Sequence, residues 1–264
     1  MKIKIIALAT IFLSQYSFAQ EGAKYSEESL KSLPVLFMQT AAEYRALCFQ
    51  AYNTAKYQME EMLEHHKRRA RREHWAIVTD LDETILDNSP EEARLIKANK
   101  DWNAKDWNTW VNEANATEVP GAGDFLRWAN SKGITIFYIS NRDTSQVMST
   151  LANLQKLNLP NADTAHMMFL ANTSSKEARR LKVMEQHKIK MLLGDNLNDF
   201  MNVFEKKDIP SRKTEVDNQH DNWGIKFIVL PNAYYGEWEN AIYEYKRGLT
   251  PAQRDAARKS LLRD

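Results

Sequence analysis

The sequence predicts an α/β protein whose mainly parallel central sheet is covered by helices on both faces. Two observations predict this fold class: short, nearly continuous apolar runs recur along the chain, and stretches with helical spacing separate several of them. The apolar runs cover residues 75–79, 134–139, 167–170, 191–193 and 226–230. Strands of this kind are buried on both faces, as in parallel sheets with a helix layer on each side.

The bulk composition is that of an ordinary globular protein. The 264 residues are 43% hydrophobic and 27% charged, enough for one large domain with a sizeable core. The 36 Lys and Arg residues nearly balance the 35 Asp and Glu residues. No bulk charge therefore attracts the chain to nucleic acid or to anionic lipid, and we expect no nucleic acid polymer as a partner.

Residues 1–19 are predicted to be a cleaved signal peptide. Lys2 and Lys4 precede an apolar stretch at residues 5–13, and small residues lead to a cleavage site at Ala19. The apolar stretch is shorter than the ~20 residues that span a bilayer. No cysteine lies near the cleavage site to accept a lipid. We therefore expect a periplasmic or secreted protein without a stable membrane anchor.

Residues 20–72 are predicted to form an N-terminal helical segment. Apolar residues recur at helical spacing from Pro34 to about Lys67, which predicts one long amphipathic helix. The single cysteine, Cys48, falls on its apolar stripe, so we expect it to be buried, and it cannot form an intramolecular disulfide. The basic run at residues 65–72 is interpreted as a solvated helix end rather than a phosphate-binding arm.

The sheet is predicted to be built from residues 73–87 and 121–235. Residues 88–120, which carry three tryptophans, are an insertion after the first strand that can fold over the strand ends as a cap. Residues 236–264 are predicted to be a C-terminal helical segment. Two of the helical stripes between the later strands are Val147, Leu151 and Leu154, and Ala178, Leu181 and Met184.

The strongest chemical signal is a pair of carboxylates directly after the first predicted strand. Residues 78–84, Val-Thr-Asp-Leu-Asp-Glu-Thr, carry Asp80 and Asp82 at the strand's carboxyl end, where such sheets bind ligands. Two crowded carboxylates require a cation or a proton in compensation. Asp80 can attack phosphorus to form a phosphoaspartate. Asp82 can protonate the leaving oxygen and then deprotonate the attacking water.

A second acidic motif follows the strand predicted at residues 191–193. Asp195 and Asp199 are four residues apart, so they face the same way if a helix begins there. Mg²⁺ favours a few carboxylates together with water and phosphate oxygens. We therefore predict that Asp80, the backbone carbonyl of Asp82 and Asp195 bind Mg²⁺. Asp199 is predicted to hold a metal-bound water or fix its neighbours, with an ordinary helix N-terminal acid as the alternative.

Two further polar motifs offer contacts to a phosphate. Ser140 and Asn141 follow the second strand of the sheet and supply a hydroxyl and amides, although Ser140 can also serve only as a helix cap. Lys176 opens the next predicted helix and can neutralise charge on the nucleophile and the phosphoryl group, although a lone lysine there is often solvated.

In this order, and each after a strand, the four motifs resemble those of the haloacid dehalogenase superfamily. The wording Asp-Leu-Asp-Glu-Thr, Ser-Asn-Arg, Ser-Ser-Lys and Gly-Asp-Asn-Leu-x-Asp-Phe is similar to that of its bacterial class C acid phosphatases. Segments outside the motifs also resemble that family, namely residues 42–52, 105–107, 119–122 and 231–238. The resemblance covers nearly all of the chain after residue 19.

The resemblance implies a Rossmann-like phosphatase domain at residues 20–264 with a helical cap or flanking domain. It implies Mg²⁺, an acidic pH optimum and action on small-molecule phosphomonoesters, often 5′-nucleotides. Family members place aromatic rings over the active site, which implies substrate binding by Trp107 and Tyr235, although such rings can also serve only to pack the cap against the core. Family members can also form homodimers. Members are typically envelope lipoproteins; this chain departs from them because it lacks the lipid-accepting cysteine. It also has Ser140 where threonine is common.

Two other functions are compatible with parts of this pattern. One is another hydrolase of the same superfamily, acting on carbon–halogen bonds or phosphonates, but Asp82 argues against it because an alkoxide leaving group requires an acid at that position. The other is an envelope protein that binds nucleotides or metal without turnover. The intact set of four aspartates argues against a degenerate site.

Overall fold

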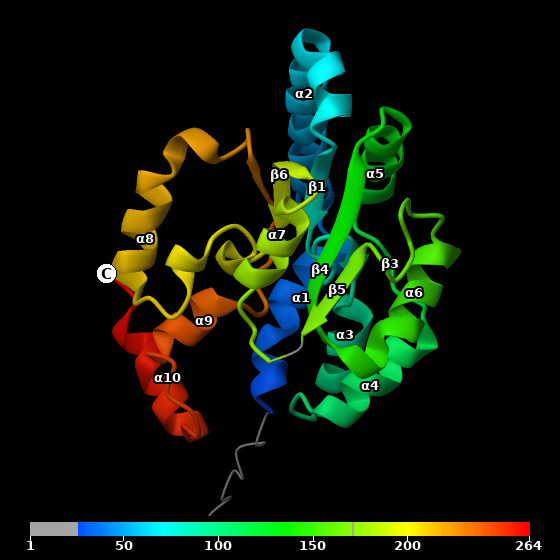
Figure 1. The fold of residues 1–264 in the computed structure, drawn as a ribbon. Coiled ribbons are helices and arrows are strands. Elements are labelled where there is room, and N and C mark those ends of the chain that lie inside the picture. Colours follow the sequence, from blue (N-terminus) through cyan, green and yellow to red (C-terminus); the bar gives the residue numbers. More distant parts are fainter. Residues whose placement is uncertain (1–25, 171) are drawn as a thin grey trace, which may run out of the picture.

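A computed structural model describes residues 26–170 and 172–264, and its centre is a sheet of five parallel strands (Figure 1). The strand order is β5-β4-β1-β6-β7, which are Met167–Leu170, Thr135–Asp143, Trp75–Thr79, Lys188–Gly194 and Phe227–Val229. These strands coincide with the five apolar runs, so the predicted α/β class is confirmed. The predicted signal peptide lies outside the described residues.

Helices flank the sheet along most of the described chain. The α-helices are α1 (Ser32–Thr40), α2 (Ala42–Arg72), α3 (Ser89–Ala98), α4 (Ala104–Glu113), α5 (Ala122–Ser131), α6 (Val147–Lys156), α7 (Glu177–Met184), α8 (Ile209–Asn218), α9 (Glu237–Ile242) and α10 (Pro251–Ser260). Short 3₁₀ turns are η1 (Glu27–Lys31), η2 (Thr144–Gln146), η3 (Leu197–Asp199), η4 (Asn202–Phe204) and η5 (His220–Asn222).

Alternate residues of β1 pack into two hydrophobic clusters, one on each face of the sheet. Trp75 and Ile77 belong to the larger cluster, which includes buried residues of α2, α5 and α6. Ala76 and Val78 belong to a smaller cluster with residues of α7, η4 and α8. Because successive strand side chains point to opposite faces, one apolar run supports both helix layers.

The N-terminal helical segment differs from the prediction because it contains two α-helices rather than one. Ala41, between α1 and α2, has an extended backbone with φ −76° and ψ 126°. The Thr40 hydroxyl donates to the Leu36 carbonyl at 2.6 Å, a contact that competes with regular helix geometry. The break lets α1 pack against α3 of the insertion. Cys48 on α2 is fully buried, as predicted.

The helix predicted around residues 178–184 is present as α7, but the apolar stripe assigned to it is not the buried face. Leu181 and Met184 are exposed, whereas Arg180 is buried. The Arg180 guanidinium donates to the backbone carbonyl of Asp199 at 2.9 Å. The buried face of α7 therefore includes the hydrogen-bonded guanidinium of Arg180, and a search for apolar periodicity does not detect a buried polar residue.

The insertion after β1 begins and ends in a short antiparallel pair, β2 (Leu86–Asp87) with β3 (Thr117–Glu118). Between these strands lie α3 and α4. Arg94 of α3 forms an ion pair with Glu113 of α4 at 2.6 Å, which joins the two helices. This arrangement places the insertion beside the carboxyl end of β1, where the chain's acidic motif begins.

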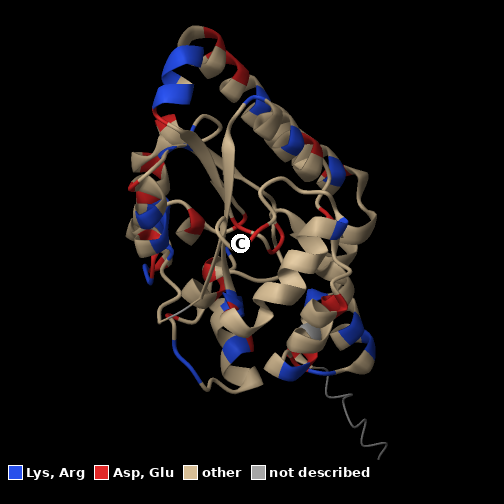
Figure 2. Ribbon diagram, turned by 45° about the vertical axis from the view of Figure 1, so that its right-hand side comes forward, with Lys and Arg blue, Asp and Glu red and all other residues tan. Residues whose placement is uncertain are grey.

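The C-terminal helices return to the start of the described chain. Arg258 of α10 donates to Glu27 of η1 at 2.9 Å and to the Tyr243 hydroxyl at the same distance. The basic end of α2 is largely solvent-exposed and appears blue at the top of the molecule in Figure 2, as predicted for a solvated helix end. No helix within the described ranges combines the length and apolar character needed to cross a membrane.

Candidate active site

The polar motifs meet at one edge of the sheet because parallel strands end on the same side. Asp80 follows β1, Asp195 follows β6, and Lys176 lies between β5 and α7. Ser140 and Asn141 lie within β4, which is longer than predicted. The pairing of β4 with β5 is irregular between Ile139 and Asp143, so the strand bulges where these polar residues occur.

A cavity of about 630 Å³ opens at this edge, a size typical of small-molecule sites. Its lining includes most of the predicted site residues: Asp80, Asp82, Asn141, Lys176, Asp195, Asp199, Trp107 and Tyr235. Arg142 and Glu83 also line it. The insertion contributes Glu91, Glu92, Trp102 and Trp107 to the wall.

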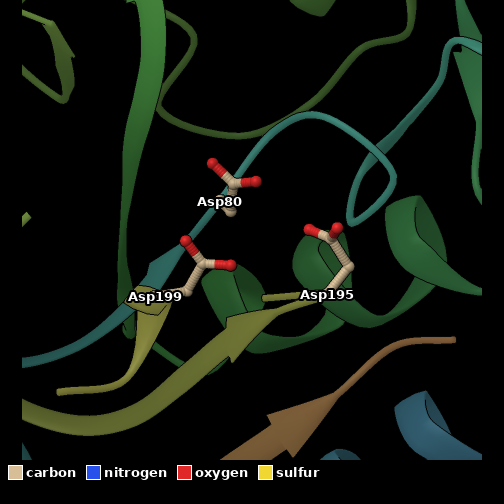
Figure 3. A group of neighbouring side chains, drawn as sticks. All are labelled: Asp80, Asp195 and Asp199. Atoms are coloured by element: carbon tan, nitrogen blue, oxygen red, sulfur yellow. The ribbon is translucent and has the colours of Figure 1, made fainter. Parts of the chain in front are cut away.

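Three carboxylates form the centre of the cavity. Oxygens of Asp80, Asp195 and Asp199 all lie within 4.8 Å of one another, and Figure 3 shows the three groups facing a common space. Asp199 lies on the 3₁₀ turn η3 rather than on a regular helix. The backbone amide of Asn196 donates to the Asp199 carboxylate at 3.0 Å. A Cβ atom on Gly194 would lie 2.4 Å from Asp199, so this close approach requires glycine.

Lys176 is the cation that contacts two of these carboxylates. Its ammonium donates to Asp80 and lies 2.6 Å from Asp199. Burial lowers the pKa of Lys176, but the carboxylates of Asp199 and Asp80 outweigh that effect, so the pKa lies above its ordinary value. Lys176 therefore stays charged next to Asp80, as the predicted neutralising role requires.

The carboxylates carry more negative charge than Lys176 balances. Burial raises the pKa of Asp80 to about 7, with further rises from Asp199 and Asp82 against the opposing effect of Lys176. Burial, followed by repulsion from Asp199 and Asp80, holds the pKa of Asp195 well above its ordinary value. Both shifts express the cost of ionising several carboxylates in a buried cluster.

This donor set fits a hard divalent cation. The three side chains offer only carboxylate oxygens, the ligands that Mg²⁺ and Ca²⁺ prefer. Lys176 contacts Asp80 and Asp199, whereas the side-chain hydrogen bonds to Asp195 come from the neutral groups of Thr84 and Asn232. A metal ion bound among these oxygens would supply the positive charge that Asp195 lacks.

Asp82 has a cation of its own. Arg142 donates to its Oδ1 from Nη2 at 2.8 Å and from Nε at 3.0 Å. The side-chain amide of Asn88 donates from Nδ2 to the same oxygen at 2.8 Å. The Asn88 side-chain oxygen in turn accepts from the Trp110 indole at 2.8 Å. Asp82 is thus held by a planar guanidinium and an oriented amide, which fix its position beside Asp80.

The two predicted phosphate-binding residues of β4 differ in accessibility. Ser140 is fully buried; its hydroxyl accepts from the Arg142 amide at 3.0 Å and donates to Asp82 at 3.4 Å. Asn141 lines the cavity, and its side chain donates to the Ser174 carbonyl at 3.0 Å and accepts from Arg179 at 2.6 Å. These bonds join the end of β4 to the loop that carries Lys176.

The two predicted substrate-binding aromatics both line the cavity. Trp107 comes from α4 and has the Arg142 guanidinium 5.4 Å from its ring centroid. Tyr235 comes from the loop after β7, and its hydroxyl donates to the Glu83 carboxylate. The two rings are far apart in the sequence, one before and one after most of the sheet strands, but both line the same cavity.

Arg142 and Glu83 are contacts of the site that the sequence does not single out. Arg142 is adjacent to the predicted Ser-Asn pair, and its pairing with Asp82 depends on the end of β4 meeting the loop after β1. Glu83 is buried in a left-handed backbone conformation, φ 57°, which is uncommon outside glycine. Burial, with Asp82 nearby, raises the pKa of Glu83 to about 8. Its place directly after Asp82 in the sequence carries no signal of burial.

Comparisons with known proteins agree with this geometry. Residues 15–238 match the family described as HAD superfamily, subfamily IIIB (acid phosphatase). The chain is 38% identical to the class C acid phosphatase from Bacillus anthracis, with 90% of this chain and 98% of that chain covered and a TM-score of 0.84. A crystal structure of the class C acid phosphatase from the same organism with tungstate bound matches with the same identity and coverage and a TM-score of 0.85. The protein therefore belongs to subfamily IIIB of the HAD superfamily and is a phosphomonoesterase.

Proposed function

We propose that the protein is a magnesium-dependent acid phosphatase that transfers the phosphoryl group of a phosphomonoester to Asp80 and then to water. The observation that carries the proposal is the charge arrangement around Asp80. A buried carboxylate meets one lysine and two further carboxylates at the carboxyl end of β1. This arrangement suits a nucleophile that reacts next to a bound cation.

In the proposed first step, an Asp80 oxygen attacks phosphorus and the bond to the leaving oxygen breaks. Asp82, which must enter this step in its protonated form, donates that proton to the leaving oxygen, so the alcohol leaves as a neutral molecule and Asp82 becomes a carboxylate. In the second step, Asp82 takes a proton from water, and the resulting nucleophile releases phosphate from Asp80. Lys176 balances charge on Asp80, while Asn141 and Ser140 are proposed to orient the phosphate end of the substrate.

The carboxylates of Asp80 and Asp195, with the backbone carbonyl of Asp82, are proposed to hold Mg²⁺. When bound, Mg²⁺ would supply positive charge to the phosphate oxygens and to the carboxylate cluster. Asp199 is proposed to fix its neighbours, because Lys176 and the Asn196 amide already bind its carboxylate. The tungstate in the Bacillus anthracis protein, a tetrahedral oxyanion like phosphate, supports an anion position in this fold.

The substrates are proposed to include 5′-nucleotides, whose base would contact Trp107 and Tyr235. Both rings line the same cavity as Asp80. Stacking on an aromatic ring contributes about 1–3 kcal/mol per base. Since this contact is remote from phosphorus, Tyr235→Ala should raise KM for a 5′-nucleotide several-fold while barely changing hydrolysis of glycerol phosphate. Equal losses on both substrates would indicate a damaged site, and no loss on either would remove Tyr235 from it.

Turnover of a chromogenic aryl phosphate, with and without EDTA, tests the proposed function. We expect hydrolysis that EDTA abolishes and added Mg²⁺ restores. A protein that binds nucleotide or metal without turning over any phosphomonoester would contradict catalysis. Hydrolysis that persists after complete metal removal would contradict the metal-dependent mechanism.

We also propose that the protein is exported without a lipid anchor, because residues 1–19 have signal-peptide features and no cysteine lies near Ala19. Mass spectrometry of the protein from its native envelope should give a mature chain that starts at Gln20 and has no acyl mass. An intact Met1 or a lipid adduct would contradict this. By family resemblance the protein can also form a homodimer, and light scattering would measure its oligomeric state.

A further inference from the structure

We infer that Asn232 and Thr84 are positioning residues for the metal ligand Asp195. The inference rests on the proposed function, because it assumes that Asp195 binds Mg²⁺. Neither Asn232 nor Thr84 is among the residues that line the cavity. The contact through which each is proposed to influence a bound metal is its hydrogen bond to the Asp195 carboxylate.

The two oxygens of Asp195 are bound by different parts of the chain. Asn232 donates from Nδ2 to Oδ2 at 2.8 Å, and the Thr84 hydroxyl donates to Oδ1 at 3.2 Å. Asn232 follows β7, whereas Thr84 lies on the loop after β1. A carboxylate held at both oxygens cannot rotate freely about its terminal bond, so its remaining lone pairs keep a fixed direction.

The Asn232 side chain is itself oriented. Its Oδ1 accepts from the backbone amide of Tyr234 at 3.1 Å, which leaves Nδ2 directed at Asp195. This bond also settles which end of the amide faces the carboxylate. An oxygen in the reverse orientation would face the Asp195 oxygen with no hydrogen between them.

Thr84 is held in place equally firmly. It is fully buried, and its backbone carbonyl accepts from the Tyr52 hydroxyl of α2. Its hydroxyl therefore reaches Asp195 from a fixed backbone. Since the loop of Thr84 also carries Asp80 and Asp82, the bond to Asp195 ties the two acidic motifs to each other.

Among residues 26–170 and 172–264, Asp195 has hydrogen-bond donors but no side-chain cation, in contrast to Asp80 and Asp199. Neutral donors favour an ionised carboxylate without competing for the metal as an ammonium group would. Asn232 and Thr84 therefore orient Asp195 for a divalent cation while leaving the negative charge of its carboxylate available to that cation.

Calorimetric titration of Mg²⁺ into the full-length mature protein tests the inference. Asn232→Ala should weaken Mg²⁺ binding about 10- to 100-fold, as loss of an outer hydrogen bond to a ligand typically does. Thr84→Val should weaken it as well, whereas Thr84→Ser, which keeps the hydroxyl, should bind like wild type. Asn218→Ala is the matched control, because this exposed asparagine also donates to a carboxylate, Glu215 at 3.4 Å, on α8.

Thermal unfolding in EDTA and in saturating Mg²⁺ separates positioning from a structural role. If Asn232 only supports the fold, Asn232→Ala lowers Tm equally in both conditions and leaves the Mg²⁺ Kd within twofold of wild type, and the inference is overturned. If Asn232→Ala does not fold, the Thr84→Val and Thr84→Ser pair decides, and equal Kd values for the two overturn it. Wild-type protein that fails to bind Mg²⁺ would instead contradict the proposed function.

Discussion

Asp82 and Asp195 are both carboxylates beside Asp80, but they are held in different ways. Asp82 is paired with the buried guanidinium of Arg142 through two nitrogens. Asp195 receives hydrogen bonds from Thr84 and Asn232, which carry no charge. The Asp82 side of the site therefore has a built-in counterion, whereas the Asp195 side would take its counterion from the metal ion that we propose.

We propose that this difference separates two chemical tasks, proton transfer by Asp82 and metal binding by Asp195. A residue that moves protons must keep its position throughout the reaction, and a fixed guanidinium provides that without a metal. A metal ligand must instead leave its charge available, because a permanent counterion would weaken metal binding. Substitutions on the two sides should therefore affect stability and metal affinity in opposite patterns.

The largest loss of kcat is expected at Asp80, beside which both Asp82 and Asp195 lie. Asp80→Asn should reduce kcat by at least about 10³-fold, ~4 kcal/mol of transition-state stabilisation, because an amide is a poor nucleophile. The fold should persist, since asparagine has nearly the same shape. Steady-state turnover of an aryl phosphate measures the loss, and retention of more than about a tenth of wild-type kcat, a loss below ~1.4 kcal/mol, would contradict the role of Asp80.

Asp82→Asn should be the next most severe change. General acid–base catalysis contributes about 10²–10⁴-fold, so kcat should fall within that range, most for alkyl phosphates and least for aryl phosphates with good leaving groups. Stability in EDTA should also fall by about 1–3 kcal/mol, because Arg142 stays buried without its carboxylate. Equal losses of kcat for alkyl and aryl phosphates would count against proton transfer by Asp82.

Metal affinity should distinguish Asp195 from Asp199. Loss of an outer contact to a metal ligand typically weakens metal binding about 10- to 100-fold. Asp195→Asn should weaken Mg²⁺ binding by more than this, and Asp199→Asn should weaken it by this amount or less. Calorimetric titration of both variants with Mg²⁺ makes the comparison. Wild-type affinity in Asp195→Asn would remove this residue from the metal site, and a larger loss in Asp199→Asn would reverse the two assignments.

The smallest effect concerns pH and stability without metal. The folded-state pKa of Asp80 is raised from 3.8 to about 7, so its contribution to stability is complete below about pH 4 and is lost as pH rises through about 7. Asp195, whose pKa is also raised, contributes with the same sign. In EDTA, Tm of wild type should therefore fall with rising pH more steeply than Tm of Asp195→Asn. Asp221→Asn, an exposed acid, serves as the control and should follow wild type, whereas an identical slope in Asp195→Asn would count against repulsion at the site.

The sheet and the central aspartates could be predicted from the sequence because they depend on local patterns. A buried strand that ends in acids identifies Asp80 and Asp195 without knowledge of distant contacts. The break at Ala41 was not predictable, since the apolar spacing continues through it and the packing of α1 on α3 decides it. The apolar stripe on α7 predicted the wrong buried face, because a buried arginine, Arg180, is polar and does not contribute to an apolar pattern.

Contacts between segments that are distant in the sequence account for most of the site contacts that the sequence did not reveal. Arg142 pairs with Asp82, Tyr235 binds Glu83, and Asn232 binds Asp195, and each pair joins residues that lie far apart in the chain. No spacing rule connects such residues. The motifs therefore indicated the groups that we propose to react, while the structure was needed to find the groups that hold them.

Trapping the reaction intermediate tests the role of Asp80 most directly. Wild-type protein mixed with an aryl phosphate and Mg²⁺ would be quenched in acid during the first turnover, digested and analysed by peptide mass spectrometry, with Asp82→Asn included to slow hydrolysis of the intermediate. We predict a phosphoryl group on the peptide that contains Asp80, reducible by borohydride at that residue and missing in Asp80→Asn. A phosphoryl group on any other residue, or release of phosphate during turnover with no phosphorylated peptide in either protein, would contradict the account.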